Sequence, residues 1–135
     1  MIVLDASVAL KWFVDGEPLV ENAREVLDHI ERDPRSYIVP ELFINELLAV
    51  LPRLPGASPA SVREALSLVE SLGLARIGNG HELIALAADY ACLWKISGYD
   101  AVYVALASLT GGVWLTADAR AARKIRKPAL VRLLG

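Results

Sequence analysis

The chain begins Met1-Ile2-Val3-Leu4-Asp5-Ala6-Ser7, and three aliphatic residues of this stretch run directly into a carboxylate. A short segment that is apolar at every position is typical of a strand buried on both faces, as in a parallel sheet. Ligands of open α/β sheets bind just beyond the carboxyl ends of the strands, which is where Asp5 stands. Asp5 would also be an ordinary cap for the next helix, so a functional role depends on other acids in equivalent places.

Short apolar segments alternate with longer amphipathic ones along the rest of the chain. The pattern predicts strands at residues 2–4, 37–39, 74–77, 113–115 and 129–133. It predicts helices at residues 7–13, 19–32, 41–51, 59–72, 81–96 and 100–109, and a basic helix from Ala119 that Pro128 ends. Strands separated by helices indicate an α/β fold with a parallel sheet covered on both faces. Because no repeat or linker interrupts the pattern, we expect one domain over residues 1–135.

The composition is strongly apolar, with 55% hydrophobic residues and a mean hydropathy of +0.42. The longest apolar segments, such as residues 83–88, are too short to span a bilayer, and no signal peptide is recognisable, so we expect a cytoplasmic protein without a membrane segment. The surplus apolar surface indicates a large core and a partner interface. The single cysteine, Cys92, excludes an internal disulfide and a cysteine zinc site, and we expect it in the core.

Charge is distributed unevenly along the chain. The net charge of −2 does not suggest a nucleic-acid-binding protein. However, six of the 14 basic residues follow Asp118 and none of the acids does. The C-terminal end is therefore predicted to form a positive patch on an acidic body, with a solvated helix face as the alternative.

Glu46 is the most informative acid, because its neighbours one helical turn away are all apolar (Leu42, Phe43, Ala49 and Val50). It is therefore predicted to point into the face that the helix buries. A buried carboxylate without a partner costs several kcal/mol. Glu46 must pair with a basic residue, reach water at the edge of the core, or bind a metal ion with other acids. Asp89 has a similar apolar setting, and we expect it at the edge of its apolar stripe.

Two further acids stand where a site at one sheet edge would need them. Asp118 follows the predicted strand at residues 113–115 after Thr116-Ala117, much as Asp5 follows the first strand, and Asp100 is predicted to cap a helix. Capping explains Asp100 and Asp118 individually, but it does not explain Glu46. Four converging carboxylates would repel one another unless a hard cation lay between them, and oxygen ligands favour Mg²⁺ or Mn²⁺ over zinc. Two such ions about 4 Å apart can activate water for phosphodiester hydrolysis.

These residues resemble the PIN-domain family and, within it, the VapC-like toxins of type II toxin–antitoxin systems. The matching motifs cover nearly the whole chain: residues 2–7, Pro40-Glu41-Leu42 followed by Glu46-Leu47, Tyr99-Asp100-Ala101, and Leu115-Thr116-Ala117-Asp118. The resemblance implies a three-layer α/β/α fold whose five-stranded parallel sheet has the strand order 3-2-1-4-5. It also implies an Mg²⁺- or Mn²⁺-dependent ribonuclease that forms a homodimer and is inhibited by a small antitoxin protein.

Carried over by position, the resemblance assigns the catalytic and metal-binding acids as Asp5, Glu46, Asp100 and Asp118. It assigns Ser7 and Thr116 as the hydroxyl residues that support them. We expect Asp5 to hold the metal centrally and Asp118 to place a second ion or the attacking water. The basic residues Arg120, Arg123 and Lys124 are candidates for contacting the RNA backbone.

Two alternatives remain open at this point. The chain could be a partner-binding or RNA-processing PIN module without a toxin role, with an apolar surface formed by Trp12, Phe13 and Trp94 that grips a partner helix. It could also be a different α/β enzyme with an acidic pocket, such as a phosphatase or a phospho-receiver domain. Haloacid dehalogenase-like phosphatases need a second aspartate where Ser7 stands, and receivers need an adjacent acid pair before the first helix, so both fit less well.

Overall fold

A parallel sheet of five short strands organises the fold. The computed structural model describes all 135 residues. The strands are β1 (Ile2–Leu4), β2 (Tyr37–Pro40), β3 (Ala75–Ile77), β4 (Val113–Thr116) and β5 (Val131–Leu133). They are ordered β3-β2-β1-β4-β5, with Ile2 opposite Tyr37 in β2 and Leu4 opposite Leu115 in β4. This confirms the predicted sheet and its order, and it makes β1 the central strand.

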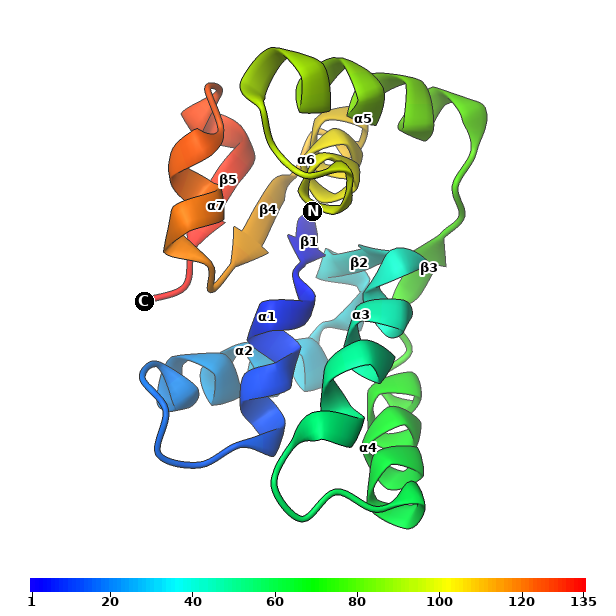
Figure 1. Cartoon of the computed structure of the whole chain (residues 1–135), viewed down its shortest axis with the longest axis vertical. Coiled ribbons are helices and arrows are strands. Elements are labelled where there is room, and N and C mark those ends of the chain that lie inside the picture. The colour runs from blue at the N-terminus through cyan, green and yellow to red at the C-terminus, as the bar shows by residue number, and fades with distance from the viewer.

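Seven α-helices cover the sheet, which forms the middle of three layers (Figure 1). The helices are α1 (Ala6–Leu10), α2 (Val20–Arg32), α3 (Leu42–Val50), α4 (Pro59–Ser71), α5 (His81–Trp94), α6 (Gly98–Thr110) and α7 (Ala119–Lys124). Helix α6 lies against β1, β2 and β4, and α5 packs over α6 on the outside. Helices α1 and α3 contact the opposite side of the sheet, where α2 and α4 also lie.

The core lies where α6 crosses the central strands. Every residue from 101 to 107 in α6 is buried, as expected for a helix covered by a sheet on one side and by α5 on the other. In β1, Val3 and Leu4 are fully buried on opposite faces, and Trp114 of β4 is fully buried beside them. No helix is both long and apolar enough to cross a membrane.

Gly112 marks a close approach between two chain segments. A Cβ atom at this position would lie 2.3 Å from the carbonyl oxygen of Met1, closer than atoms can pack. The same carbonyl accepts a hydrogen bond from Val113 N at 3.0 Å and so begins the pairing of β1 with β4. Glycine is therefore required where the chain enters β4.

Several predicted details are wrong. Ser97, not Asp100, caps α6, since Ser97 Oγ accepts from the backbone N–H of Asp100 at 3.0 Å. The basic helix ends at Lys124, before Pro128, because Ile125 turns into the core with extended backbone. The first predicted helix changes to a 3₁₀ turn, η1 (Lys11–Phe13). Cys92 is exposed, because α5 packs only one of its apolar faces on α6.

Candidate active site

Asp5 lies at the carboxyl end of the central strand and is almost completely buried. Its Oδ1 accepts a hydrogen bond from Trp114 Nε1 at 3.0 Å. Its Oδ2 accepts from the backbone N–H of Ser7 at 3.0 Å and from Thr116 Oγ1 at 3.3 Å. Both carboxylate oxygens are therefore satisfied and oriented. Burial raises the pKa of Asp5 above its ordinary value, although these hydrogen bonds favour the charged form.

Ser7 and Thr116 join the loops that follow β1 and β4. Their hydroxyl oxygens lie 3.3 Å apart. Ser7 Oγ accepts from the backbone N–H of Ala117 at 2.9 Å, and Thr116 Oγ1 accepts from that of Asp118 at 3.1 Å. Through these bonds the two hydroxyl residues position Asp5 and Asp118 relative to each other. Asp118 is exposed and caps α7 through a 3.0 Å bond from Ala121 N to its Oδ1.

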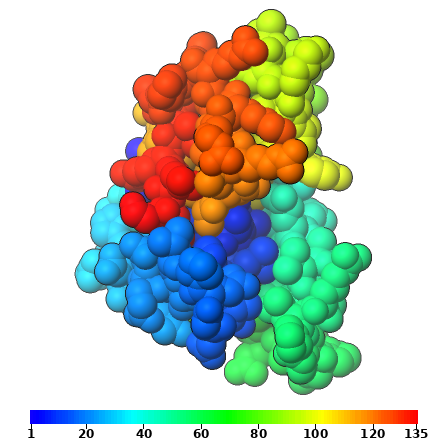
Figure 2. Space-filling view, turned by 60° about the vertical axis from the view of Figure 1, so that its left-hand side comes forward, coloured from blue at the N-terminus to red at the C-terminus, as the bar shows by residue number.

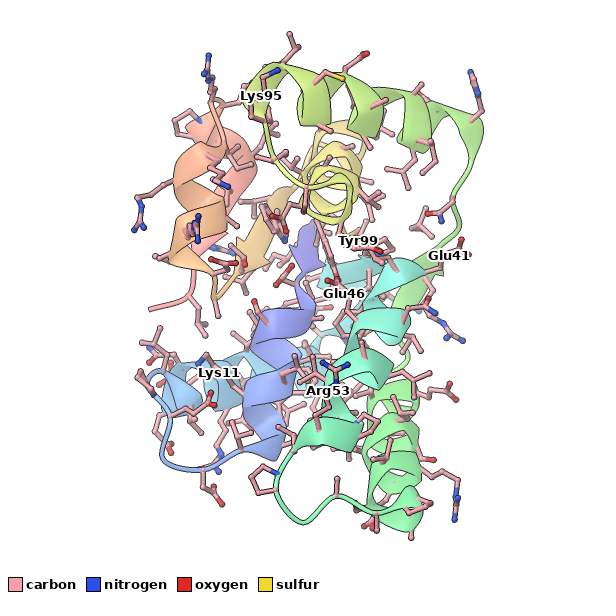
Figure 3. The ribbon with its side chains drawn as sticks, in the orientation of Figure 1. Lys11, Glu41, Glu46, Arg53, Lys95 and Tyr99 are labelled. Carbon is pink, nitrogen blue, oxygen red and sulfur yellow. The ribbon has the colours of Figure 1, made fainter.

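Glu46 approaches from α3, on the side of that helix that faces α1 and α6 (Figure 3). Its Oε1 is buried and has no hydrogen-bond partner, and the same is true of the Tyr103 hydroxyl in α6. Burial and the negative charges of Asp5 and Asp100 raise the pKa of Glu46, whereas the nearby Tyr103 hydroxyl lowers it. Burial and the charges of Asp5 and Glu46 raise the pKa of the Tyr103 hydroxyl, which therefore stays protonated. Glu46 Oε1 and the Tyr103 hydroxyl are thus the two buried polar atoms of this region without a hydrogen bond.

The four predicted acids influence one another electrostatically. Burial and the charges of Asp5 and Asp118 raise the pKa of Asp100, whereas the Ser97 side chain and the charge of Lys124 in α7 lower it. No lysine or arginine forms an ion pair with any of the four acids. Asp5, Glu46 and Asp100 thus lie near enough to influence one another, and Asp118 influences Asp100. We call these four acids the acidic cluster, and none of them has a basic partner.

A hard divalent cation fits the chemistry of this cluster. The available donors are carboxylate and hydroxyl oxygens, which suit Mg²⁺ and Mn²⁺. A cation would give the buried Glu46 oxygen a partner. It would also favour the charged form of the carboxyl groups and so lower their raised pKa values. In the arrangement described, no three acidic side chains lie close enough to coordinate one ion directly. Binding would therefore require side-chain rotation or bridging water.

The basic residues proposed for RNA contact lie on α7, which begins directly after Asp118. Arg120, Arg123 and Lys124 are all exposed. The effect of Lys124 on Asp100 indicates that this helix lies beside the acidic cluster. Asp89, by contrast, is exposed on α5 and is no part of the cluster.

Sequence reasoning missed Trp114 and Tyr103. Trp114 donates to Asp5, and its ring stacks on Tyr103 with centroids 5.9 Å apart. A signal for Trp114 existed, because it precedes Thr116 by two positions on a strand and so faces the same way. The proposed apolar surface is wrong for Trp94, which is buried and stacks on Tyr90 with centroids 4.2 Å apart. Trp12 and Phe13 are only partly exposed and pack against the core.

Several solved structures have the same fold. A toxin–antitoxin complex from Klebsiella pneumoniae matches with a TM-score of 0.73 and 14% identity, covering 100% of this chain and 98% of that one. VapBC2 from Rickettsia felis, bound to a promoter DNA fragment, matches with a TM-score of 0.72 and 12% identity, covering 100% of both chains. FitAcB from Neisseria gonorrhoeae matches with a TM-score of 0.70 and 18% identity, covering 100% of this chain and 97% of that one. At such identities the likeness is one of fold alone.

Sequence comparison identifies the family. No curated protein is significantly similar to this chain in sequence. The model of the PIN domain matches residues 2–127, which is nearly the whole chain. The order of strands, the central Asp5 and the extent of this match lead to one conclusion: the chain belongs to the PIN-domain family.

Proposed function

We propose that this chain is a metal-dependent endoribonuclease and the toxin of a VapBC-type toxin–antitoxin pair. PIN domains are nucleases, and this chain has the family's fold over its full length. The observation that carries the proposal is the buried Glu46 oxygen without a partner, in a cluster of acids without a basic neighbour. Such an arrangement is costly in a protein that has no use for a cation.

Mg²⁺ or Mn²⁺ would be held by Asp5, Glu46, Asp100 and Asp118, and would supply an activated water and stabilise the charge that develops on the cleaved phosphodiester. The chain's own residues prepare the site. Trp114, Thr116 and the Ser7 backbone N–H fix the Asp5 carboxylate, so that Asp5 itself needs little reorganisation when a cation binds. The protonated Tyr103 hydroxyl can donate to Glu46 and limit the rotation of its carboxylate. Thr116 and Ser7 hold the loop that carries Asp118.

An antitoxin protein and a second copy of the chain are proposed as partners. The Klebsiella pneumoniae and Rickettsia felis structures are toxin–antitoxin assemblies, which supports a similar partner here. A short reading frame beside this gene should encode it, and co-expression should restore growth that the chain alone arrests. Light scattering of the purified chain should give twice the monomer mass if it forms a homodimer.

The function is tested with Asp5→Asn, which keeps the shape of the side chain but removes its charge. We expect RNA cleavage in Mn²⁺ to fall by at least about 100-fold, because metal binding weakens. Asp89→Asn removes an equivalent charge from the exposed face of α5 and should cleave normally. Full activity of Asp5→Asn with an unchanged circular dichroism spectrum would refute the mechanism.

A further inference from the structure

A hollow adjoins the acidic cluster on the surface where three parts of the chain meet. Figure 2 shows the N-terminal segment in blue meeting the segment around residue 118 in orange and the α3 region in teal. The hollow has a volume of about 290 Å³, and its polar lining is Ser7, Lys11, Glu17 and Asp118. The rest of its lining is apolar. Its volume is close to the lower limit of small-molecule sites, so it can hold part of a nucleotide.

Lys11 supplies the hollow's only positive charge. Its side chain is only 16% exposed, and its Nζ donates to the carbonyl oxygen of Pro18 at 2.9 Å. Nζ also lies 3.5 Å from Glu17 Oε2, whose side chain is 54% exposed. The ammonium group is thus held in place by a neutral carbonyl and paired with a carboxylate that can move into solvent.

The phosphates of RNA and the carboxylates of the acidic cluster repel one another, so basic side chains beside the cluster would help the strand to approach, in addition to a bound cation. A lysine ammonium is a compact charge suited to a single phosphate. Lys11 is already ordered, so it loses little side-chain entropy on binding. The exposed basic residues of α7 lie on open surface and do not line the hollow.

We propose that Lys11 is a substrate-positioning residue whose ammonium group binds an RNA phosphate in this hollow, beside the acidic cluster, in competition with Glu17. The inference rests on the proposed ribonuclease function. It goes beyond that function by naming the residue that sets the strand's position and the carboxylate that opposes binding.

The competing explanation is that Lys11 only fastens residues 15–19 to η1. The two explanations predict opposite effects of Glu17→Gln on RNA binding. Lys11→Gln and Glu17→Gln remove the same ion pair, so a purely structural role changes RNA binding in the same direction in both variants. A phosphate-binding Lys11 makes the two changes opposite, because Glu17→Gln frees the ammonium group while the Pro18 carbonyl still holds it.

The test uses a fluorescein-labelled single-stranded RNA of random sequence, with anisotropy read in Ca²⁺ and cleavage read in Mn²⁺. Lys11→Gln should weaken binding on the order of tenfold, raise KM by a similar factor and leave kcat nearly unchanged. The slope of log affinity against log salt should fall by about 0.7. Glu17→Gln should tighten binding by about twofold to fivefold. Lys11→Arg should retain most of the affinity.

Two matched controls carry the same charge changes elsewhere. Lys95→Gln removes a lysine charge at the end of α5, far from Lys11 (Figure 3). Glu21→Gln removes a glutamate charge and breaks the exposed ion pair with Arg24. Both should leave KM unchanged. Equal binding by Lys11→Gln and the unmodified chain, or weaker binding by Glu17→Gln, would overturn this inference alone. An unmodified chain that neither binds nor cleaves RNA would overturn the proposed function and this inference with it.

Discussion

Trp114 Nε1 donates a hydrogen bond to Asp5 Oδ1 at 3.0 Å, although 109 residues separate the two in the chain. The contact exists because β4 lies beside β1 in parallel register, with Trp114 opposite Val3. It completes the hydrogen bonding of Asp5, whereas Glu46 Oε1 remains without a partner. One acid of the cluster is therefore fixed by the protein and another is left available to a ligand.

Trp114→Phe tests the first half of this relationship. The substitution keeps a ring to stack on Tyr103 but leaves Asp5 Oδ1 without its donor. We expect a loss of about 1–3 kcal/mol in the free energy of unfolding, measured by urea denaturation. RNA cleavage should fall by about tenfold or more, because the group that orients Asp5, the proposed metal ligand, is lost. Trp94→Phe, in the buried stack on Tyr90, is the control for ring size and should keep full activity.

Glu46→Gln tests the second half through the pH dependence of stability. The folded pKa of Glu46 lies above its unfolded value, so the folded state binds more protons and stability falls as pH rises between the two values. Asp5 and Asp100 act in the same direction. In EDTA, thermal unfolding of the unmodified chain should therefore show lower stability at neutral pH than in mild acid. Glu46→Gln should recover about 1 kcal/mol or more at neutral pH.

Glu82→Gln is the control for that experiment, since it removes a carboxylate from the exposed first turn of α5. It should leave the pH dependence unchanged. A Glu46→Gln variant that is less stable than the unmodified chain at neutral pH would show that Glu46 has an internal partner.

Mg²⁺ and Mn²⁺ should stabilise the folded chain in proportion to their affinity. An ion that binds only the folded state adds about 2.7 kcal/mol at 100 times its Kd. Differential scanning fluorimetry at constant ionic strength should show the midpoint rising with either ion, and Asp100→Asn should reduce the rise while Asp89→Asn retains it. Equal midpoints with and without the ions, at every concentration tried, would contradict a metal site in the acidic cluster.

Gly112→Ala tests the entry into β4. The new methyl group would meet the Met1 carbonyl at 2.3 Å, so β1 must shift or the pairing of Met1 with Val113 must break. We expect a loss of about 1–3 kcal/mol in the free energy of unfolding. Gly98→Ala meets no atom within 4 Å and should be neutral or slightly stabilising. Equal stability of the two variants would mean that the chain ends adjust freely.

The sequence alone determined what depends on neighbouring residues. Apolar residues at every position of 2–4 are typical of a covered strand, and the acids at positions 5 and 118 come shortly after strands. The apolar neighbours of Glu46 indicated that a carboxylate is drawn toward the core. The strand order came from the resemblance to the PIN-domain family, which the sheet confirms.

Only the tertiary structure decided which groups meet across the sheet and which faces stay open. Helix α5 is apolar nearly all round, so periodicity could not say that Leu83, Ala87, Tyr90 and Trp94 face α6 while Cys92 faces solvent. The bond between Trp114 and Asp5, and the place of Lys11 beside Asp118, likewise depend on register and packing between distant segments. Local patterns specify spacing along one element, whereas a site of this kind is made by the distances between elements.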